Sequence, residues 1–352
     1  MFRKIPFTES ENRIIDTAEG MFGSGTIEIR DTPVTPRANF DALFYEKHPF
    51  WMPDIRDAHY VGSTLYNDRL GRGFHKDIVD IFGLHWRYVP TAGGSMVEPG
   101  TPLMEDANDW RELVKIPDVK SWDWASEGQA AKIDMNYPAL FSCVNGFGFE
   151  RLISFMDFMG AAMAIIDEDQ IDAVKELLDA LTDMGCDVID MLCTYWPKLD
   201  LIEIHDDWGS QKAPFFSQDV AYELFVPRMK RLTDRIHSWG RRALLHSCGH
   251  NVERVQCYID GGFDLWAPQT MNDIEYLYDN YGDKIVLCVY PPENDMATRS
   301  EEEQRAYARS FAERFCQPGK PSVLGITGVR RVTPAFLDEL YIHSRKLYFE
   351  QD

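Results

Sequence analysis

Short apolar runs alternate with longer amphipathic segments from about residue 137 onward. The apolar runs predict strands over residues 139–145, 186–191, 199–205, 242–247, 263–267, 284–289 and 322–327. The amphipathic segments predict helices over residues 149–166, 169–185, 219–240, 252–261 and 300–315. Alternation of this kind implies parallel strands joined by right-handed crossovers. The pattern therefore predicts an α/β fold made of repeated strand and helix units.

The amino-terminal part of the chain follows a different pattern. Residues 1–55 contain several helix and strand breakers, with one predicted helix over 38–47, and we interpret them as an arm or cap. One or more strands between residues 56 and 90 would complete an eight-stranded set. We therefore predict a (β/α)8 TIM barrel over residues 56–352 with an irregular N-terminal extension. Periodicity also permits an open doubly wound sheet, although no Gly-x-Gly-x-x-Gly motif follows a first strand to support a dinucleotide fold.

The predicted strand over 242–247 leads into two candidate metal ligands, His246 and Cys248. Residues two apart in a strand project to the same side, so both side chains would point the same way at the strand's end. Active-site groups of α/β folds gather at the carboxyl ends of strands. The same residues also suit an ordinary strand end, because free cysteine is commonly buried and inert.

A second group of polar residues follows the predicted strand over 199–205, which comes before the strand over 242–247 in the chain. Asp206 and Asp207 come directly after the predicted strand over 199–205, so in a barrel they would neighbour His246. Either carboxylate could bind a metal, act as a general acid or base, or orient His246. Alternatively, one of them caps the helix that begins near residue 217 or stabilises the loop.

The third ligand of such a metal site has three candidates. Cys288, at the end of the strand over 284–289, would complete a His/Cys/Cys zinc shell, although a buried core cysteine is the other interpretation. Asp207 and Glu203 are the alternatives. Around these strand ends, aromatic side chains would form a pocket suited to a small, largely uncharged organic ligand, or would simply cover the barrel mouth. The pocket residues are Phe147, Trp208, Trp266 and Tyr290.

Composition narrows the partners and the compartment. The 36 basic and 57 acidic side chains give a net charge of −21, which repels phosphate backbones and anionic lipid, so neither nucleic acid nor a membrane surface is expected as a partner. The 7 cysteines are odd in number and form no Cys-x-x-Cys pair, which disfavours a disulfide framework. The chain has no apolar run of membrane-spanning length and no signal-peptide core, so we expect a soluble, cytoplasmic protein.

Several segments together resemble the uroporphyrinogen decarboxylase superfamily, and specifically its methyltransferase branch. They are residues 206–211 (Asp-Asp-Trp-Gly-Ser-Gln), 226–232, 246–249 (His-Ser-Cys-Gly) and 262–264, with weaker landmarks at 82–86 and 115–118. The resemblance implies a (β/α)8 barrel whose site lies at the carboxyl ends of the strands. True decarboxylases carry an arginine-rich motif that residues 50–57 lack. A chain of charge −21 without that motif is poorly suited to a polyanionic tetrapyrrole.

Within the branch, the resemblance places zinc ligands at His246 and Cys248. The thiol-activating enzymes take a third cysteine from the last strand, and residues 323–328 contain none. The chain is also similar to the methyltransferase components of anaerobic demethylase systems, whose zinc ligands are less uniform. These enzymes pass a methyl group from an O-methyl donor to a corrinoid protein.

We therefore expect a zinc-dependent methyltransferase that demethylates a small methyl ether, in the first place a methoxylated aromatic. The acceptor would be the Co(I) corrinoid (cobalamin) of a separate carrier protein. In this reaction Asp206 and Asp207 are the catalytic candidates. A methylcobalamin:thiol methyltransferase and a decarboxylase are the alternatives. The oligomeric state stays open, a homodimer included.

Overall fold

The computed structural model describes residues 4–19, 26–66, 77–90, 94–98, 100–143 and 145–351. Its contacts divide the chain into two compact units. Unit 1 comprises Met1–His59, Asp134–Ala139 and Asp264–Asp352, and unit 2 comprises Tyr60–Ile133 and Leu140–Phe263. The predicted boundary between an arm over 1–55 and a barrel over 56–352 is a different division and stays a prediction.

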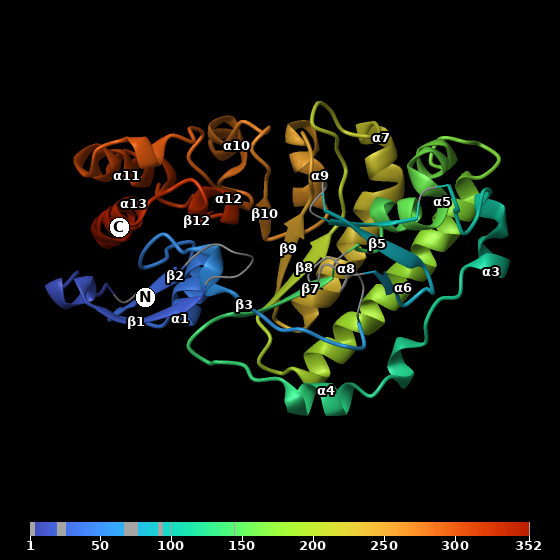
Figure 1. The fold of residues 1–352 in the computed structure, drawn as a ribbon, viewed down its shortest axis with the longest axis horizontal. Helices are drawn as coiled ribbons and strands as arrows, with labels where there is room; N and C mark the ends of the chain where they lie inside the picture. The colour runs from blue at the N-terminus through green and yellow to red at the C-terminus, as the bar shows by residue number, and fades with distance from the viewer. Residues whose placement is uncertain are drawn as a thin grey trace. The chain divides into compact units, whose positions relative to one another are not determined.

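Unit 2 is built on three parallel strands, β7 (Ala139–Cys143), β8 (Leu201–His205) and β9 (Arg242–His246), paired in that order. α5 (Phe149–Ala164) and α6 (Ile171–Tyr195) connect β7 to β8. α7 (Gln218–Val220), the π-helical turn η7 (Ala221–Phe225) and α8 (Val226–Ser238) connect β8 to β9. Figure 1 shows α6 and α8 next to each other beside these strands. η8 (Val252–Arg254) and α9 (Val255–Asp260) follow β9.

The rest of unit 2 precedes β7 in the chain and is less regular. β4 (Ile78–Val79), β5 (His85–Val89) and β6 (Gly94–Val97) form a small antiparallel sheet. Four short helical segments follow: η5 (Ala107–Asp109), α3 (Trp110–Leu113), η6 (Val119–Ser121) and α4 (Trp124–Ala130). The strand β3 (His59–Tyr60) lies at the boundary of the two units. Thus β3, β4 and β5 are the described strands within residues 56–90.

Unit 1 also contains three parallel strands, β10 (Leu265–Ala267), β11 (Val286–Val289) and β12 (Ser322–Leu324). α10 (Ile274–Tyr281), η9 (Met296–Thr298) and α11 (Glu301–Phe315) lie between them in the chain, and α12 (Ile326–Val329) and α13 (Pro334–Glu350) follow. α11 and α13 lie side by side (Figure 1). α11 begins with a capping box in which Ser300 and Glu303 satisfy each other's backbone N–H groups.

The amino-terminal segment of unit 1 includes a β-hairpin. η1 (Glu9–Asn12) leads into the antiparallel strands β1 (Ile14–Glu19) and β2 (Thr26–Arg30), followed by α1 (Pro36–Asp41), η3 (Ala42–Glu46) and η4 (Ile55–Asp57). A buried ion pair joins this segment to α13: Arg345 Nε lies 3.0 Å from Glu11 Oε2, and both side chains are almost fully buried. Tyr341 donates a hydrogen bond to the same Glu11 oxygen, at 2.8 Å. Glu11 thus holds the segment against α13.

The fold class predicted from the periodicity is confirmed: parallel strands alternate with helices from residue 139 onward, as in a (β/α)8 barrel. One predicted strand is wrong, because residues 186–191 lie inside α6, a single helix of 25 residues. Gly185 does not end a helix there. A Cβ atom at Gly185 would lie 2.8 Å from a Leu232 methyl and 3.1 Å from the Phe147 ring, so the glycine lets α6 and α8 pack closely.

The predicted strand over 322–327 is shorter than expected, since Ile326 already begins α12. Among the described helices, none has the length and apolar character needed to cross a membrane.

Candidate metal centre

Four side chains with metal-binding atoms meet at the ends of β8 and β9. They belong to His205, Asp207, His246 and Cys248, and one ligand atom from each lies within 4.8 Å of the others. The register explains this arrangement, because His205 stands directly opposite His246 in the parallel pair. Asp207 and Cys248 each follow two residues later. Each strand end therefore contributes a histidine and a second donor.

The two histidine rings stack on each other, with centroids 4.5 Å apart and planes at 20°. His205 Nδ1 lies 2.5 Å from Glu150 Oε2, at the start of α5. With the Nδ1 proton shared with that carboxylate, Nε2 carries the lone pair that a metal requires, an arrangement that recurs in zinc proteins. Burial, and then the neighbouring His205, lower the pKa of His246, which favours its neutral, metal-binding form.

The second donors are held by contacts within the same loops. The backbone N–H of Cys248 donates to Asp207 Oδ1 at 2.6 Å, and His246 Nε2 lies 3.2 Å from Cys248 Sγ. Buried Ser247 accepts hydrogen bonds from the Trp208 backbone, the Asn251 amide and the Tyr258 hydroxyl, each at 3.2 Å. These contacts fix the backbone on both sides of Cys248.

The two loops approach so closely that glycine is needed in each. Gly249 has φ +98°, and a Cβ atom there would lie 2.2 Å from the backbone of Gly209. A Cβ atom on Gly209 would lie 2.5 Å from Asn251 Oδ1. Backbone hydrogen bonds connect the same loops, from Asp206 N to His246 O at 3.0 Å and from His250 N to Ser210 O at 2.8 Å. Side chains larger than glycine would separate the loops that carry Asp207 and Cys248.

Asp206, although adjacent to Asp207, has different surroundings. Its buried carboxylate accepts hydrogen bonds from the backbone of Phe149 at 3.1 Å and of Glu150 at 2.8 Å, and from the Trp208 indole at 2.7 Å. Burial, and then the charge of Glu150, raise its pKa to about 7. A Cβ atom on Gly148 would lie 2.3 Å from Asp206 Oδ2. Asp206 thus anchors the first turn of α5, which positions Glu150, and its predicted catalytic role stays a prediction.

The other predicted site residues lie outside this cluster of four. The Glu203 carboxylate accepts a hydrogen bond from Ser142 Oγ at 2.6 Å, and Phe147 and Trp208 are buried in unit 2. Cys288, Trp266 and Tyr290 belong to unit 1 and are buried there, on β10, on β11 or just after it. Their predicted roles as a zinc ligand and as pocket residues stay predictions.

His205 and Glu150 are not among the site residues predicted from the sequence. One signal for His205 is present in the sequence: His205-x-Asp207 repeats the spacing of His246-x-Cys248 at the end of the neighbouring strand. Glu150 gives no comparable signal, because it reaches His205 from the start of a helix 55 positions earlier in the chain.

The donor set suits zinc. Zinc binds histidine nitrogen, cysteine sulfur and carboxylate oxygen, usually in four-coordinate sites, and two histidines, one cysteine and one aspartate provide all three atom types. Oxygen-only ions such as Mg²⁺ and Ca²⁺ do not favour a site with a thiolate and two imidazoles. The residues therefore fit a zinc ion.

The comparisons with known proteins give a likeness of fold. No protein-family model matches the chain, and no curated protein sequence matches it. Among solved structures, a methyltransferase from Methanosarcina mazei is similar, with a TM-score of 0.54 and 15% sequence identity over 94% of this chain and 88% of that one. The fold and the four-residue cluster together define a barrel-type α/β protein with a candidate metal centre at its strand ends. At 15% identity the likeness shows a shared fold.

Proposed function

We propose that this protein is a zinc-dependent methyltransferase. The observation that carries the proposal is the convergence of His205, Asp207, His246 and Cys248 at the ends of two parallel strands, where α/β enzymes hold their active sites. The shared fold with a methyltransferase supports it. Zinc held by these residues would supply a Lewis acid for the oxygen of a methyl ether.

The protein's own residues prepare this centre. Glu150 sets the tautomer of His205, and the lowered pKa of His246 keeps that ring neutral near pH 7. Catalytic zinc sites keep one position for substrate, whereas structural sites are closed by four protein ligands. Asp207 is the donor that we expect to yield this position, because its Oδ1 already accepts the Cys248 N–H.

The finer proposal concerns the donor and the acceptor. We propose a small O-methyl donor, in the first place a methoxylated aromatic, and the Co(I) corrinoid of a separate carrier protein as acceptor. The resemblance of residues 206–211 and 246–249 to demethylase methyltransferases supports it, as does a net charge of −21, which disfavours polyanionic substrates. The mixed nitrogen, sulfur and oxygen donor set favours it over a sulfur-rich thiol-activating site.

Metal analysis of the purified protein and of three variants, His205→Ala, His246→Ala and Cys248→Ala, tests the centre. We expect zinc in the wild type and its loss in each variant. Cys193→Ala is the matched control, because Cys193 is buried in α6 of the same unit and lies outside the cluster. Full zinc occupancy in both His246→Ala and Cys248→Ala would contradict the proposal.

The reaction is tested separately by following the Co(I) absorbance of a corrinoid carrier with a panel of methoxyarenes. Loss of Co(I) that requires both the zinc-loaded protein and a methoxyarene supports methyl transfer. Methylation of a thiol by methylcobalamin, without any reaction of methoxyarenes, would instead identify a thiol methyltransferase. Turnover of a porphyrinogen without zinc would identify a decarboxylase.

A further inference from the structure

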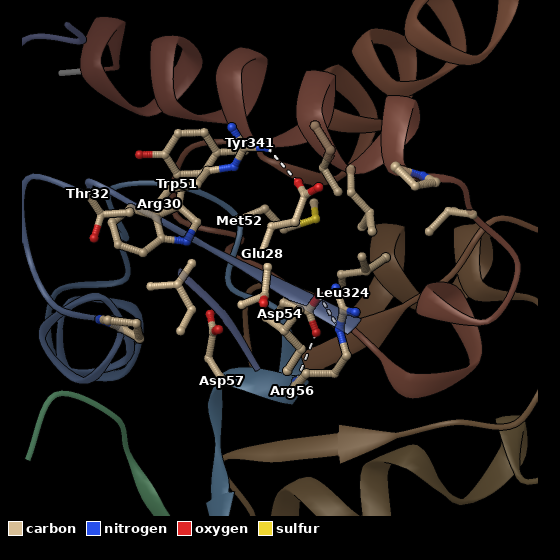
Figure 2. A pocket seen from close by; sticks show the side chains of 18 of the residues that line it. Glu28, Arg30, Thr32, Trp51, Met52, Asp54, Arg56, Asp57, Leu324 and Tyr341 are labelled. Atoms are coloured by element: carbon tan, nitrogen blue, oxygen red, sulfur yellow. Dashed lines mark hydrogen bonds and ion pairs between the residues drawn. The ribbon is translucent and has the colours of Figure 1, made fainter. Parts of the chain in front are cut away.

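Unit 1 contains a cavity of about 520 Å³ that no part of the proposed methyl transfer uses. Its walls come from the β1–β2 hairpin, residues 51–57, the end of β12 and helix α13 (Figure 2). Cavities between about 300 and 1,000 Å³ are typical of small organic ligands and are much larger than a metal ion needs. The apolar part of the wall includes Trp51, Met52, Leu324, Leu337, Leu340 and Tyr341.

The charged groups of this wall are unequal in number. Three acidic residues, Glu28, Asp54 and Asp57, and two basic ones, Arg30 and Arg56, line the cavity, which gives an excess of one negative charge when all are ionised. No other charged residue is among the described lining residues. A positively charged ligand would offset this excess.

Both arginines are already engaged by carboxylates. Arg56 donates to Asp54 Oδ2 from Nε at 2.9 Å and from Nη2 at 2.6 Å. Arg30 forms an ion pair with Asp338 of α13 and lies 3.4 Å from a Glu28 oxygen. These hydrogen bonds and ion pairs direct neither guanidinium to Asp57.

Asp57 is the exception among the charged residues of the cavity. Its carboxyl group pairs with no side chain among the residues that the structure describes and has only the backbone of Asp54 as a hydrogen-bond partner, and Figure 2 shows it pointing into the space between the labelled side chains. Burial, and then the charge of Asp54, raise the pKa of Asp57 to about 8. The same carboxyl raises the pKa of nearby Tyr137, after burial. A positive charge in the cavity would relieve both effects.

Aromatic rings lie on the same wall. Trp51 and Tyr341 pack with their centroids 5.6 Å apart, and the guanidinium of Arg30 already lies 5.3 Å from the centre of the Tyr341 ring. Aromatic faces attract ammonium groups as well as arginine. A carboxylate together with such rings is the combination that recognises organic cations.

We propose that this cavity binds a small organic cation, a protonated amine or a quaternary ammonium with an apolar body, and that Asp57 is its counter-ion. The proposal concerns unit 1 alone and does not depend on the proposed methyl transfer.

Calorimetric titration with benzylammonium tests the proposal, with benzyl alcohol and benzoate as the neutral and anionic probes of similar shape. We expect benzylammonium to bind at least tenfold more tightly than either probe. Equal binding of all three would show selection for the apolar body alone and would overturn the proposal. Tighter binding of benzoate, or displacement of benzylammonium by an equal concentration of Mg²⁺, would overturn it too.

Asp57→Asn should weaken benzylammonium binding at least tenfold and leave benzyl alcohol binding unchanged. Asp219→Asn is the matched control, since Asp219 is exposed in unit 2 and carries the same charge. The zinc-site variant Cys248→Ala should bind benzylammonium like the wild type, which separates this test from that of the methyltransferase. Unchanged benzylammonium binding in Asp57→Asn would overturn the proposal.

A second measurement needs no variant. Titrations of the wild type at pH 7 in buffers of different ionisation enthalpy report proton exchange on binding. We expect benzylammonium to release protons, because it favours the ionised form of Asp57. The charged and titratable groups around Asp57 are Asp54, Arg56, Glu28, Arg30 and Tyr137. No proton release with benzylammonium would overturn the role of Asp57.

Discussion

The candidate metal centre and the cavity of unit 1 both gather carboxylates, but they hold them differently. In the metal centre, Glu150, Asp206 and Asp207 each face a defined partner, and the four donor atoms lie within 4.8 Å of one another. In the cavity, Asp54 is matched by Arg56 while Asp57 faces about 520 Å³ of open volume. The first arrangement is pre-organised for a compact ion, and the second leaves room for a ligand with a body.

Small changes in backbone packing should therefore affect the candidate metal centre more than the cavity of unit 1. Gly249→Ala places a Cβ atom against the Gly209 backbone, in a left-handed conformation, and we expect it to lower the free energy of unfolding by about 3 kcal/mol and to remove zinc. Urea denaturation measures the loss. Gly240→Ala, also at positive φ but with no atom within 4 Å, should cost only about 1 kcal/mol. Equal losses of stability in Gly249→Ala and Gly240→Ala would show that the contact between the two loops does not contribute to stability.

Substitution should distinguish the roles of the adjacent carboxylates Asp206 and Asp207. Asp206→Asn places an amide N–H₂ among three N–H donors, so we expect a loss of about 2 kcal/mol in stability with zinc still bound. Asp207→Asn should instead weaken zinc binding with little effect on stability. Denaturation and metal analysis of both variants provide the check, and the reverse result would exchange their roles.

Glu150→Gln tests the contact behind the metal centre. Loss of the carboxylate that holds His205 Nδ1 should lower zinc affinity about 10- to 100-fold, as loss of such partners does in other zinc sites. Competition with a chromophoric chelator measures the affinity. Glu168→Gln, at an exposed position of the same unit, is the control and should leave it unchanged.

The smallest effect is expected in the cavity, and it depends on pH. With a folded-state pKa of about 8 against about 4 in the unfolded chain, Asp57 lowers the free energy of unfolding as pH rises from about 4 to about 8, and the loss then levels off. Asp57→Asn removes this pH-dependent loss of stability, because asparagine does not ionise. We expect its melting temperature to exceed that of the wild type by about 2 °C at pH 9, and by less at pH 5. A larger gain at pH 5 would contradict the raised pKa.

The sequence predicted the fold well where an apolar run is bounded by breakers, as for β8, β9 and β11. It failed at residues 186–191, because Gly185 resembles a helix stop while its true role is contact between α6 and α8. The pairing of His246 with Cys248 followed from strand geometry. The involvement of His205 depends on register between strands, and that of Glu150 on where α5 begins. Neither property is visible in local periodicity.

The contact between Gly209 and Gly249 determines which part of this candidate centre could be transferred to another protein. Each glycine leaves the space that the other loop fills, so a larger residue at either position would push the two loops apart and separate the candidate metal ligands. Grafting the His-x-Cys segment onto another barrel would therefore fail unless the neighbouring strand brought its own glycine with it. The unit that can be transplanted is the pair of loops, not the ligand motif.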